Sequence, residues 1–322
     1  MKFTAIASIG LAVASASFIE QQTELNKLFA SYVAKYNKSY GTVEEYMFRQ
    51  KMFANNHAEI ERHNSLNNSA TLGHNFMSDW TEEEYNTMLG YMPATIDAEP
   101  VVLENVEIPA TVDWRSLASM KVVKNQGQCG SCWAFSTIGS VESHTEIMNG
   151  EYHSLSEQQL VDCSPYTLGC EGGNYFFAFD YLHQKGSESE TAYPYKAADD
   201  NCVYDASKVV NKHVSSYNFV TPFDTAQLRA HIAQGPVSIA IEADQMVFQF
   251  YTTGVIDIKD CGTSLDHAVL AIGYGTEDGK DYILVRNSWG PTWGDHGTVK
   301  LAHDDKNVAC GASTEPAFVI TK

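Results

Sequence analysis

The odd number of cysteines, seven in all, most constrains what this chain can fold into. The first residues read as a secretory signal peptide (residues 1–16), because Lys2 is followed by a small, apolar stretch and by an Ala-Ser-Ala cleavage site at residues 14–16. Export takes the chain into an oxidising compartment, where disulfides persist. Six cysteines can therefore pair, and the seventh either bridges to another molecule or remains a reactive thiol.

Charge and hydropathy narrow the class of protein. The chain has 21 Lys and Arg residues against 40 Asp and Glu residues, a formal net charge of −19. This acidity argues against nucleic acid and anionic membranes as partners. No apolar run is long enough to span a membrane, so we expect a soluble product of the secretory pathway. After the signal peptide about 300 residues remain, enough for two domains.

The N-terminal segment is predicted to be helical over residues 20–36 and again over residues 43–64, because apolar residues recur on one face. Six residues of the second helix fall within one ~100° stripe: Glu45, Arg49, Phe53, Asn56, Ile60 and Asn64. Taken alone, this is an amphipathic helix with Glu45 and Arg49 as an i,i+4 ion pair. Such a helix is compatible with any function.

The spacing of those six residues, E-x3-R-x3-F-x2-N-x3-I-x3-N, resembles the inhibitory prosegment of cathepsin L-like cysteine proteases at every position. Residues 73–79 resemble the second prosegment motif, G-x-N-x-F-x-D, with Met77 where the family usually has Phe. Methionine can fill the same apolar slot, so we expect weaker packing and retained function. Residues 92–108 are acidic and are predicted to form an exposed linker, at which the prosegment is cleaved from the rest of the chain. N-glycosylation sequons occur at Asn37 and Asn67.

The segment around Cys132 carries a second resemblance. Residues 129–133 read Cys-Gly-Ser-Cys-Trp, and His267 and Asn287 follow far downstream in Asp-His-Ala and Asn-Ser-Trp-Gly contexts. Their order and separations resemble those of papain-like cysteine proteases. The resemblance covers essentially the whole chain, which therefore resembles a papain-like zymogen nearest to cathepsin L.

The resemblance implies an α+β fold. A signal peptide (residues 1–16) and a helical inhibitory propeptide (residues 17–108) precede a mature peptidase domain (residues 109–322). In the papain-like two-domain fold, the helical half spans about residues 109–220 and the β-barrel-like half about residues 221–322. Strands are expected over residues 236–242, 267–274 and 282–287.

The predicted chemistry needs an ionised thiol. Cys132 opens an apolar-faced segment that ends at Asn149-Gly150, which places it at a helix N-terminus, where partial positive charge stabilises a thiolate. Pairing with His267 can bring such a pKa to roughly 3–4. His267 then acts as general acid. Asn287, held on a strand over residues 281–287, orients the imidazole.

The resemblance also assigns supporting roles. Trp289 covers the bond between His267 and Asn287 from water. Gln126 and the backbone N–H of Cys132 form an oxyanion hole, in which one donor is worth roughly 3–4 kcal/mol. The mechanism requires no metal ion or cofactor.

The disulfide pattern comes from the resemblance, since sequence alone permits many pairings. It implies the pairs Cys129–Cys170, Cys163–Cys202 and Cys261–Cys310, with Cys132 left free. A thioredoxin-like pair of Cys129 with Cys132 is the rival, but it would leave Gln126, His267 and Asn287 unexplained. Zinc binding through this C-x-x-C fits less well, because no second ligand pair has the needed spacing.

The substrate side follows from the same resemblance. Gly172 and Gly173 let a substrate backbone approach and pair in extended form, with Gly173 making the main-chain bonds. The pocket for the side chain two residues before the cut is lined by Tyr175, Ala240, Leu265 and Ala268, with Glu315 at its floor. We expect the pocket to take bulky apolar side chains and also Arg, which Glu315 would meet as a charge partner.

Endopeptidase activity is favoured, because Cys170 lies only seven positions after Cys163, which leaves no room for the insertion that makes cathepsin B a dipeptidase. The expected partners are protein and peptide substrates, the chain's own propeptide and cystatin-like inhibitors, with a monomer located in a lysosome, a vacuole or the extracellular space. The rival class is a non-catalytic homologue or a prosegment-type protease inhibitor. It predicts a substitution among the four catalytic positions, and none is present.

Overall fold

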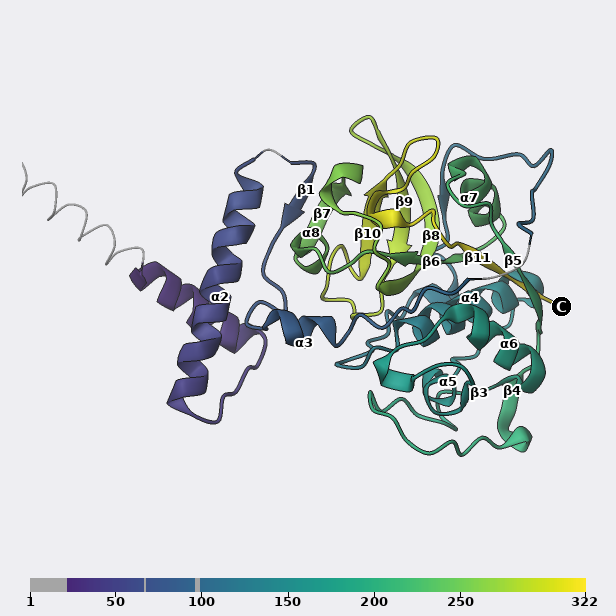
Figure 1. The fold of residues 1–322 in the computed structure, drawn as a ribbon, viewed down its shortest axis with the longest axis horizontal. Helices are drawn as coiled ribbons and strands as arrows, with labels where there is room; N and C mark the ends of the chain where they lie inside the picture. The colour runs from purple at the N-terminus through teal and green to yellow at the C-terminus, as the bar shows by residue number, and fades with distance from the viewer. Residues whose placement is uncertain (1–21, 67, 96–98) are drawn as a thin grey trace, which may run out of the picture. The chain divides into compact units, whose positions relative to one another are not determined.

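The computed structural model describes residues 22–66, 68–95 and 99–322. The predicted signal peptide and the sequon at Asn67 lie outside these residues. The described residues form two compact units (Figure 1). The helical unit comprises residues 22–66 and 74–81, and the large unit comprises residues 68–73 and the described residues from 82 onward.

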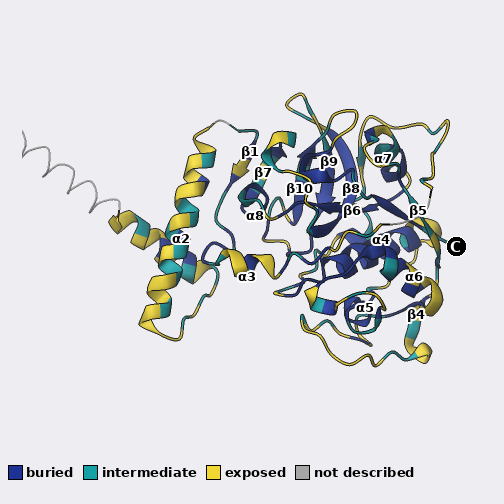
Figure 2. Ribbon diagram, viewed as in Figure 1, coloured by how far each residue is buried: buried dark blue, intermediate teal, exposed yellow. Residues whose placement is uncertain are grey.

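The helical unit contains a helix over residues 22–35 and α2 (Val43–Asn64). The prediction for the second helix is confirmed at both ends. Thr42 caps the N-terminus of α2 by accepting a bond from the Glu45 N–H at 3.1 Å. Phe53 and Ile60 are buried on an otherwise largely exposed helix (Figure 2), and Phe53 packs with Phe29 and Tyr32 in the core of the unit.

The second motif, residues 74–79 in this unit, is held by the polar residues of the first. Arg49 donates to the backbone carbonyl of Asp79 at 3.2 Å, and Asn56 donates to that of Ser78 at 3.1 Å. Three side chains donate to the buried Asp79 carboxylate: Tyr32 at 2.5 Å, Lys38 at 2.8 Å and Tyr40 at 2.8 Å. Met77 is fully buried, as its apolar role requires.

The large unit is built on one nine-stranded sheet. Its strands, in spatial order, are β1 (Ala70–Leu72), β7 (Tyr251–Ile256), β10 (Thr298–Ala302), β9 (Lys280–Arg286), β8 (His267–Glu277), β6 (Val237–Ile241), β11 (Ala317–Thr321) and β5 (Val214–Phe219), and β2 (Val112–Asp113) pairs with β8. The expected strands are present as β6, β8 and β9. Because β2 and β5 precede residue 221, the sheet draws strands from both of the expected halves.

Helices cover this sheet and the loops beside it (Figure 1). They are α3 (Glu82–Asn86), α4 (Cys132–Asn149), α5 (Glu157–Cys163), α6 (Tyr175–Lys185), α7 (Thr225–Ile232) and α8 (Met246–Gln249). Short 3-10 turns lie at Ala118–Met120, Gly169–Glu171, Ala206–Lys208, Ile258–Asp260 and Ala309–Gly311, and a small sheet pairs β3 (Ser187–Glu188) with β4 (Val209–Asn211). No helix among the described residues is long and apolar enough to cross a membrane.

Helix α4 is the central element of the large unit, and its residues 132–145 are all buried (Figure 2). It ends at Gly150, whose φ of 77° is the left-handed conformation that glycine adopts readily. Ser136 donates to the Val269 carbonyl at 2.8 Å, and a Cβ on Gly139 would lie 3.2 Å from Leu270. These small residues bring α4 close to β8, so the first residue of α4 lies near the beginning of β8.

Candidate active site

Cys132, the first residue of α4, is a free thiol and is fully buried. The other six cysteines form three disulfides, Cys129–Cys170, Cys163–Cys202 and Cys261–Cys310. The pair Cys129–Cys170 ties the loop before α4 to the turn that precedes Gly172. The framework therefore leaves one sulfur available for chemistry, and it does so at a helix N-terminus.

His267 opens β8, and Asn287 follows the last residue of β9. The His267 Nε2 atom lies 2.8 Å from the Asn287 Oδ1 atom. The Ser288 N–H also donates to this oxygen at 2.7 Å, which fixes the orientation of the amide. Nε2 must therefore donate, and Nδ1, which is buried and has no partner, is the basic nitrogen of the neutral ring.

Trp289 packs on this bond. Its ring centroid lies 4.8 Å from that of His267, and the side chain is fully buried. An indole in this position excludes water from the imidazole, so the bond between His267 and Asn287 is made in an apolar environment.

The Gln126 side chain is held from both ends. Its Oε1 atom accepts bonds from Ser288 Oγ at 2.6 Å and Trp289 Nε1 at 3.2 Å. Its Nε2 atom donates to the Cys129 carbonyl at 2.9 Å and to the Met88 carbonyl at 2.8 Å. The amide N–H group is thereby aimed at a carbonyl that comes from the segment before residue 108.

Residues 88–92 lie over these groups, and Tyr91 forms an isolated β-bridge with Gly173. The Gly90 carbonyl accepts from the Gly173 N–H at 2.9 Å, and the Met92 N–H donates to the Gly173 carbonyl at 2.9 Å. The Tyr91 N–H donates to the Asp266 carbonyl at 2.8 Å. A Cβ on Gly90 would lie 1.9 Å from the Gly130 carbonyl oxygen, so only glycine fits there.

Tyr91 fills the pocket that the sequence predicts for substrate. It is 5% exposed and belongs to one cluster with Tyr175, Ala240, Ala268 and the partly buried Leu265. Its ring stacks on Tyr175 with centroids 5.0 Å apart. Its hydroxyl donates to Glu315 Oε2 at 2.7 Å, and burial raises the pKa of this carboxyl above its usual value. The structure thus brings all five predicted pocket residues together.

The thiol and the imidazole are both neutral under this cover. Burial raises the pKa of Cys132 to about 11, although the backbone N–H groups of Ala268 and Gly90 lower it. Burial lowers the pKa of His267 to about 4, against the opposing effect of its bond to Asn287. The thiolate expected from the sequence is therefore absent here, because desolvation outweighs the helix N-terminus while residues 88–92 exclude water.

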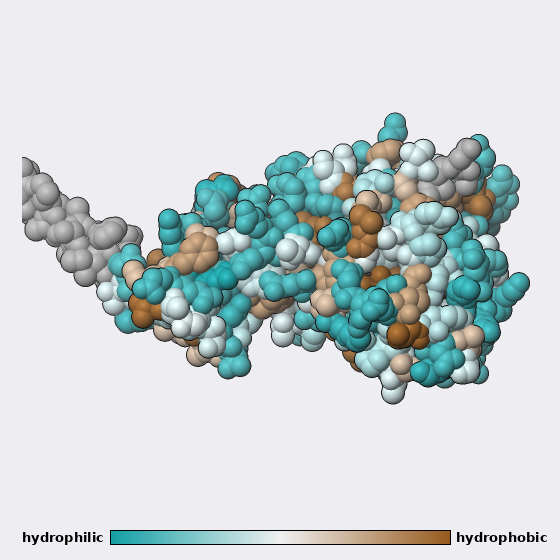
Figure 3. All heavy atoms as spheres, turned by 60° about the horizontal axis from the view of Figure 1, so that its bottom comes forward, coloured by the Kyte–Doolittle hydropathy of each residue, from teal (hydrophilic) through white to brown (hydrophobic). Residues whose placement is uncertain are grey.

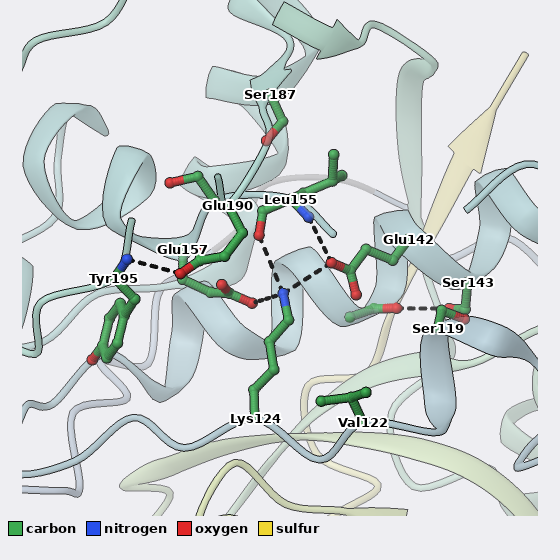
Figure 4. Close-up of polar contacts among 12 residues, drawn as sticks. Ser119, Val122, Lys124, Glu142, Ser143, Leu155, Glu157, Ser187, Glu190 and Tyr195 are labelled. Atoms are coloured by element: carbon green, nitrogen blue, oxygen red, sulfur yellow. Dashed lines mark hydrogen bonds and ion pairs between the residues drawn. The ribbon is translucent and has the colours of Figure 1, made fainter. Parts of the chain in front are cut away.

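A buried charge cluster of Lys124, Glu142 and Glu157, drawn in Figure 4, lines a cavity that Asn287 and Ser288 also line. Lys124 Nζ donates to Glu157 Oε1 at 2.7 Å and to Glu142 Oε1 at 2.9 Å. Burial raises the pKa of Glu157 to about 7; the Glu142 charge adds to this, and Lys124 opposes it. One lysine thus faces two buried carboxyl groups.

Sequence reasoning missed the segment that fills the site. Tyr85, Met88 and Tyr91 are buried and recur every three residues after the acidic start of α3, a short apolar stripe that could have been found. The Tyr85 hydroxyl donates to the Ala243 carbonyl at 2.5 Å, and its ring meets Trp289 edge-on. These contacts explain why residues from 82 onward belong to the large unit.

Family models match both parts of the chain. The model of papain family cysteine proteases matches residues 108–320, and that of the cathepsin propeptide inhibitor domain matches residues 29–85. The chain belongs to the papain family of cysteine proteases. Its propeptide makes it a zymogen of this family, and the predictions of fold, family and enzyme class are confirmed.

Individual papain-family relatives resemble the chain over most of its length. Digestive cysteine proteinase 3 of Homarus americanus is 40% identical over 330 residues and is covered, like this chain, to 99%. Digestive procathepsin L2 from the larval midgut of Tenebrio molitor has a TM-score of 0.86 at 39% identity, covering 92% of this chain and 99% of that one. A Carica candamarcensis cysteine protease in complex with E-64 has a TM-score of 0.61 at 38% identity, covering 66% and 99%.

Proposed function

We propose that this papain-family zymogen yields an endopeptidase in which Cys132 is the nucleophile and His267 the acid and base. The observation that supports this most is the pairing of His267 Nε2 with Asn287 Oδ1 at 2.8 Å. It leaves Nδ1 unpartnered at the start of β8. The free thiol of Cys132 is bonded to the backbone of Ala268, the residue that follows His267 in this strand. In this proposal Asn287 orients the ring, and Gln126 and the Cys132 N–H are the oxyanion donors.

The proposed reaction has two steps. The Cys132 thiolate attacks the scissile carbonyl carbon, and the resulting oxyanion receives bonds from Gln126 Nε2 and the Cys132 N–H. His267 then protonates the leaving amine as the C–N bond breaks, which leaves an acyl-enzyme. In the second step His267 takes a proton from water, the hydroxide attacks the thioester, and the acid product and thiol are released.

The chain direction of residues 88–92 explains why this segment is not cleaved while it occupies the site. A substrate that places its second residue before the cut in the Tyr175 pocket runs from that pocket toward Gln126. The prosegment runs the other way, because Met88 meets Gln126 and Tyr91, later in the chain, fills the pocket. Its bridge to Gly173 is parallel. No peptide bond of this segment is then presented to Cys132 in the productive direction.

The substrate proposal concerns the pocket over Glu315. Tyr91 supports a preference for bulky apolar side chains, and its hydroxyl bond to Glu315 supports acceptance of a donor at the pocket floor. We propose that Arg is also accepted there, with Glu315 as its charge partner. Hydrolysis of paired Phe-Arg and Arg-Arg peptide substrates tests this. Negligible Arg-Arg cleavage, or cleavage unchanged by Glu315→Ala, would contradict it.

Maturation is proposed to separate residues 17–108 from the peptidase of residues 109–322, with the cut near residues 109–112. Residues 107–111 are exposed, and Val112 already pairs with Tyr274 in the sheet. We further propose that acid loosens the propeptide and that the enzyme cuts its own linker. A Cys132→Ala zymogen that still matured alone at pH 4–5 would rule out self-cleavage.

Partners and location follow from the proposed activity. Cystatin-like proteins are proposed as inhibitors that enter the same site, and a monomer is proposed in a lysosome, a vacuole or the extracellular space. The face in Figure 3 supports the monomer, because its hydrophobic residues lie in separate patches among mostly hydrophilic ones. Gel filtration of the matured protein tests the oligomeric state.

The central test is labelling of the matured protein with E-64, which a relative binds in its crystal structure. We expect one adduct per chain, located on Cys132 by mass spectrometry, with parallel loss of peptide hydrolysis. Cys132→Ser should take no label. Labelling at any other cysteine, or no hydrolysis despite labelling, would favour the non-catalytic homologue.

A further inference from the structure

Tyr195 lies in the loop after β3, and its hydroxyl group is bonded to Gln126 and Ser131. Its backbone N–H donates to Glu190 Oε1 at 2.9 Å, as Figure 4 shows. Its ring meets Phe135 of α4 edge-on, with centroids 4.9 Å apart. The backbone and the ring of Tyr195 are therefore held by contacts that do not involve the hydroxyl group.

The hydroxyl joins two separate segments. It donates to the Gln126 backbone carbonyl at 2.7 Å, and its oxygen lies 2.6 Å from Ser131 Oγ. Because the phenol has one hydrogen and a carbonyl can only accept, the Ser131 hydroxyl must donate to the phenol oxygen. One atom of Tyr195 thus ties residue 126 to residue 131, which directly precedes Cys132.

Those two segments carry the two proposed oxyanion donors, the Gln126 side chain and the Cys132 N–H. Ser288 and Trp289 donate to the far end of the Gln126 side chain, and the Ser288 carbonyl accepts from the Gln126 backbone N–H at 2.9 Å. Tyr195 adds a second bond to this backbone, at the Gln126 carbonyl, and the same hydroxyl also holds Ser131. Oxyanion donors act over 2.7–3.1 Å, so a shift of a few tenths of an ångström in either segment weakens them.

We propose that Tyr195 is a positioning residue that sets the spacing of the two oxyanion donors. This inference rests on the proposed function. It assigns Tyr195 no part in ionising the thiol, since its single hydrogen is committed to the Gln126 carbonyl. Loss of the Tyr195 hydroxyl should therefore weaken stabilisation of the oxyanion without changing the reactivity of the Cys132 sulfur.

Tyr195→Phe tests the inference, because it keeps the ring and the backbone contacts and removes only the hydroxyl. In the matured enzyme we expect kcat for a peptide amide to fall about tenfold, with KM within about twofold. A peptide aldehyde, whose thiol adduct carries the same tetrahedral oxygen, should bind more weakly by a similar factor. Alkylation of Cys132 by iodoacetamide forms no oxyanion, so its rate should stay within about twofold of wild type.

Two further variants keep the test decisive. Ser131→Ala removes one of the two bonds to the phenol and should give a smaller loss of kcat. Its rate of Cys132 alkylation, like that of Tyr195→Phe, should stay close to wild type. Tyr193 lies in the same loop as Tyr195, and its hydroxyl donates to Asp162 of α5. Tyr193→Phe, which removes this hydroxyl, should leave kcat unchanged. The inference is overturned if Tyr195→Phe slows hydrolysis and alkylation in proportion, or slows neither. A wild-type enzyme that is alkylated but hydrolyses nothing would instead overturn the proposed function.

Discussion

At the scale of single residues, the state of Cys132 is the feature that most separates the zymogen from an active enzyme. Its pKa of about 11 under residues 88–92 leaves about one thiol in 10⁴ ionised at pH 7. We expect iodoacetamide to alkylate the zymogen slowly, with a rate that rises about tenfold per pH unit from 7 to 9. The matured enzyme should react faster and show no such rise. A Cys132→Ser zymogen controls for labelling elsewhere, and equal rates before and after maturation would contradict the expectation.

Tyr91 gives a second prediction at this scale. It is almost fully buried, so Tyr91→Ala should weaken the cover by about 3 kcal/mol, roughly a hundredfold in occupancy of the site. Tyr91→Phe loses the bonds that the hydroxyl makes with Glu315 and Asn174 and should cost about 1–2 kcal/mol. Peptide hydrolysis by the uncleaved zymogen at pH 7 measures both. Tyr166→Ala, at a position 85% exposed, is the control. A Tyr91→Ala zymogen as inactive as wild type would show that the pocket contact does not hold the cover.

The sequence located Cys132, His267 and Asn287 because each is embedded in a local motif. It did not locate Tyr91 or Tyr195, whose roles depend on partners 224 and 69 residues away in the chain. The neutral state of the thiol was also beyond sequence reasoning. Motifs report which groups can ionise, whereas burial by another segment decides whether they do.

At the scale of elements, the bounds of α2 were predictable because its stripe and its Thr42 cap are local signals. Helix α3 was not, since five residues carry too little periodicity. The helical unit also contains a pair of neighbouring histidines, His57 and His74, which no sequence motif predicts. His57 Nδ1 lies 3.1 Å from His74 Nε2, and the His74 ring stacks on Phe53 with centroids 4.2 Å apart.

This pair predicts how the helical unit responds to acid. Burial, with smaller contributions from His57 and Lys35, lowers the pKa of His74 to about 4, below the value of about 6.5 for an exposed histidine. The unfolded unit therefore binds more protons between these values, so stability present above pH 6.5 is lost as the pH falls toward 4. His74→Leu should lower the pH at which maturation begins. His153→Leu, at an exposed position outside this unit, is the control. An unchanged onset for His74→Leu would exclude this histidine as a trigger.

At the scale of the whole molecule, the two units respond to pH with opposite signs. Glu157 of the large unit has a folded pKa of about 7, raised by burial above the usual value for glutamate, so the folded state holds its proton longer than the unfolded chain. The stability that this group contributes is complete below about pH 4.3 and is lost as the pH rises through 7. Acid thus destabilises the propeptide through His74 while it favours the peptidase through Glu157.

Glu157→Gln isolates this second effect in the matured enzyme, because the amide keeps the shape of the protonated carboxyl and cannot titrate. We expect its free energy of unfolding at pH 4.5 to stay close to wild type, since Lys124 keeps Glu142 as its partner. Between pH 4.5 and 8 the wild type should lose on the order of 2 kcal/mol that the variant does not lose. Thermal unfolding across this range measures the difference, with Glu151→Gln at an exposed position as the control. A variant whose stability falls with pH as steeply as that of wild type would show that other groups set the neutral-pH limit of the peptidase.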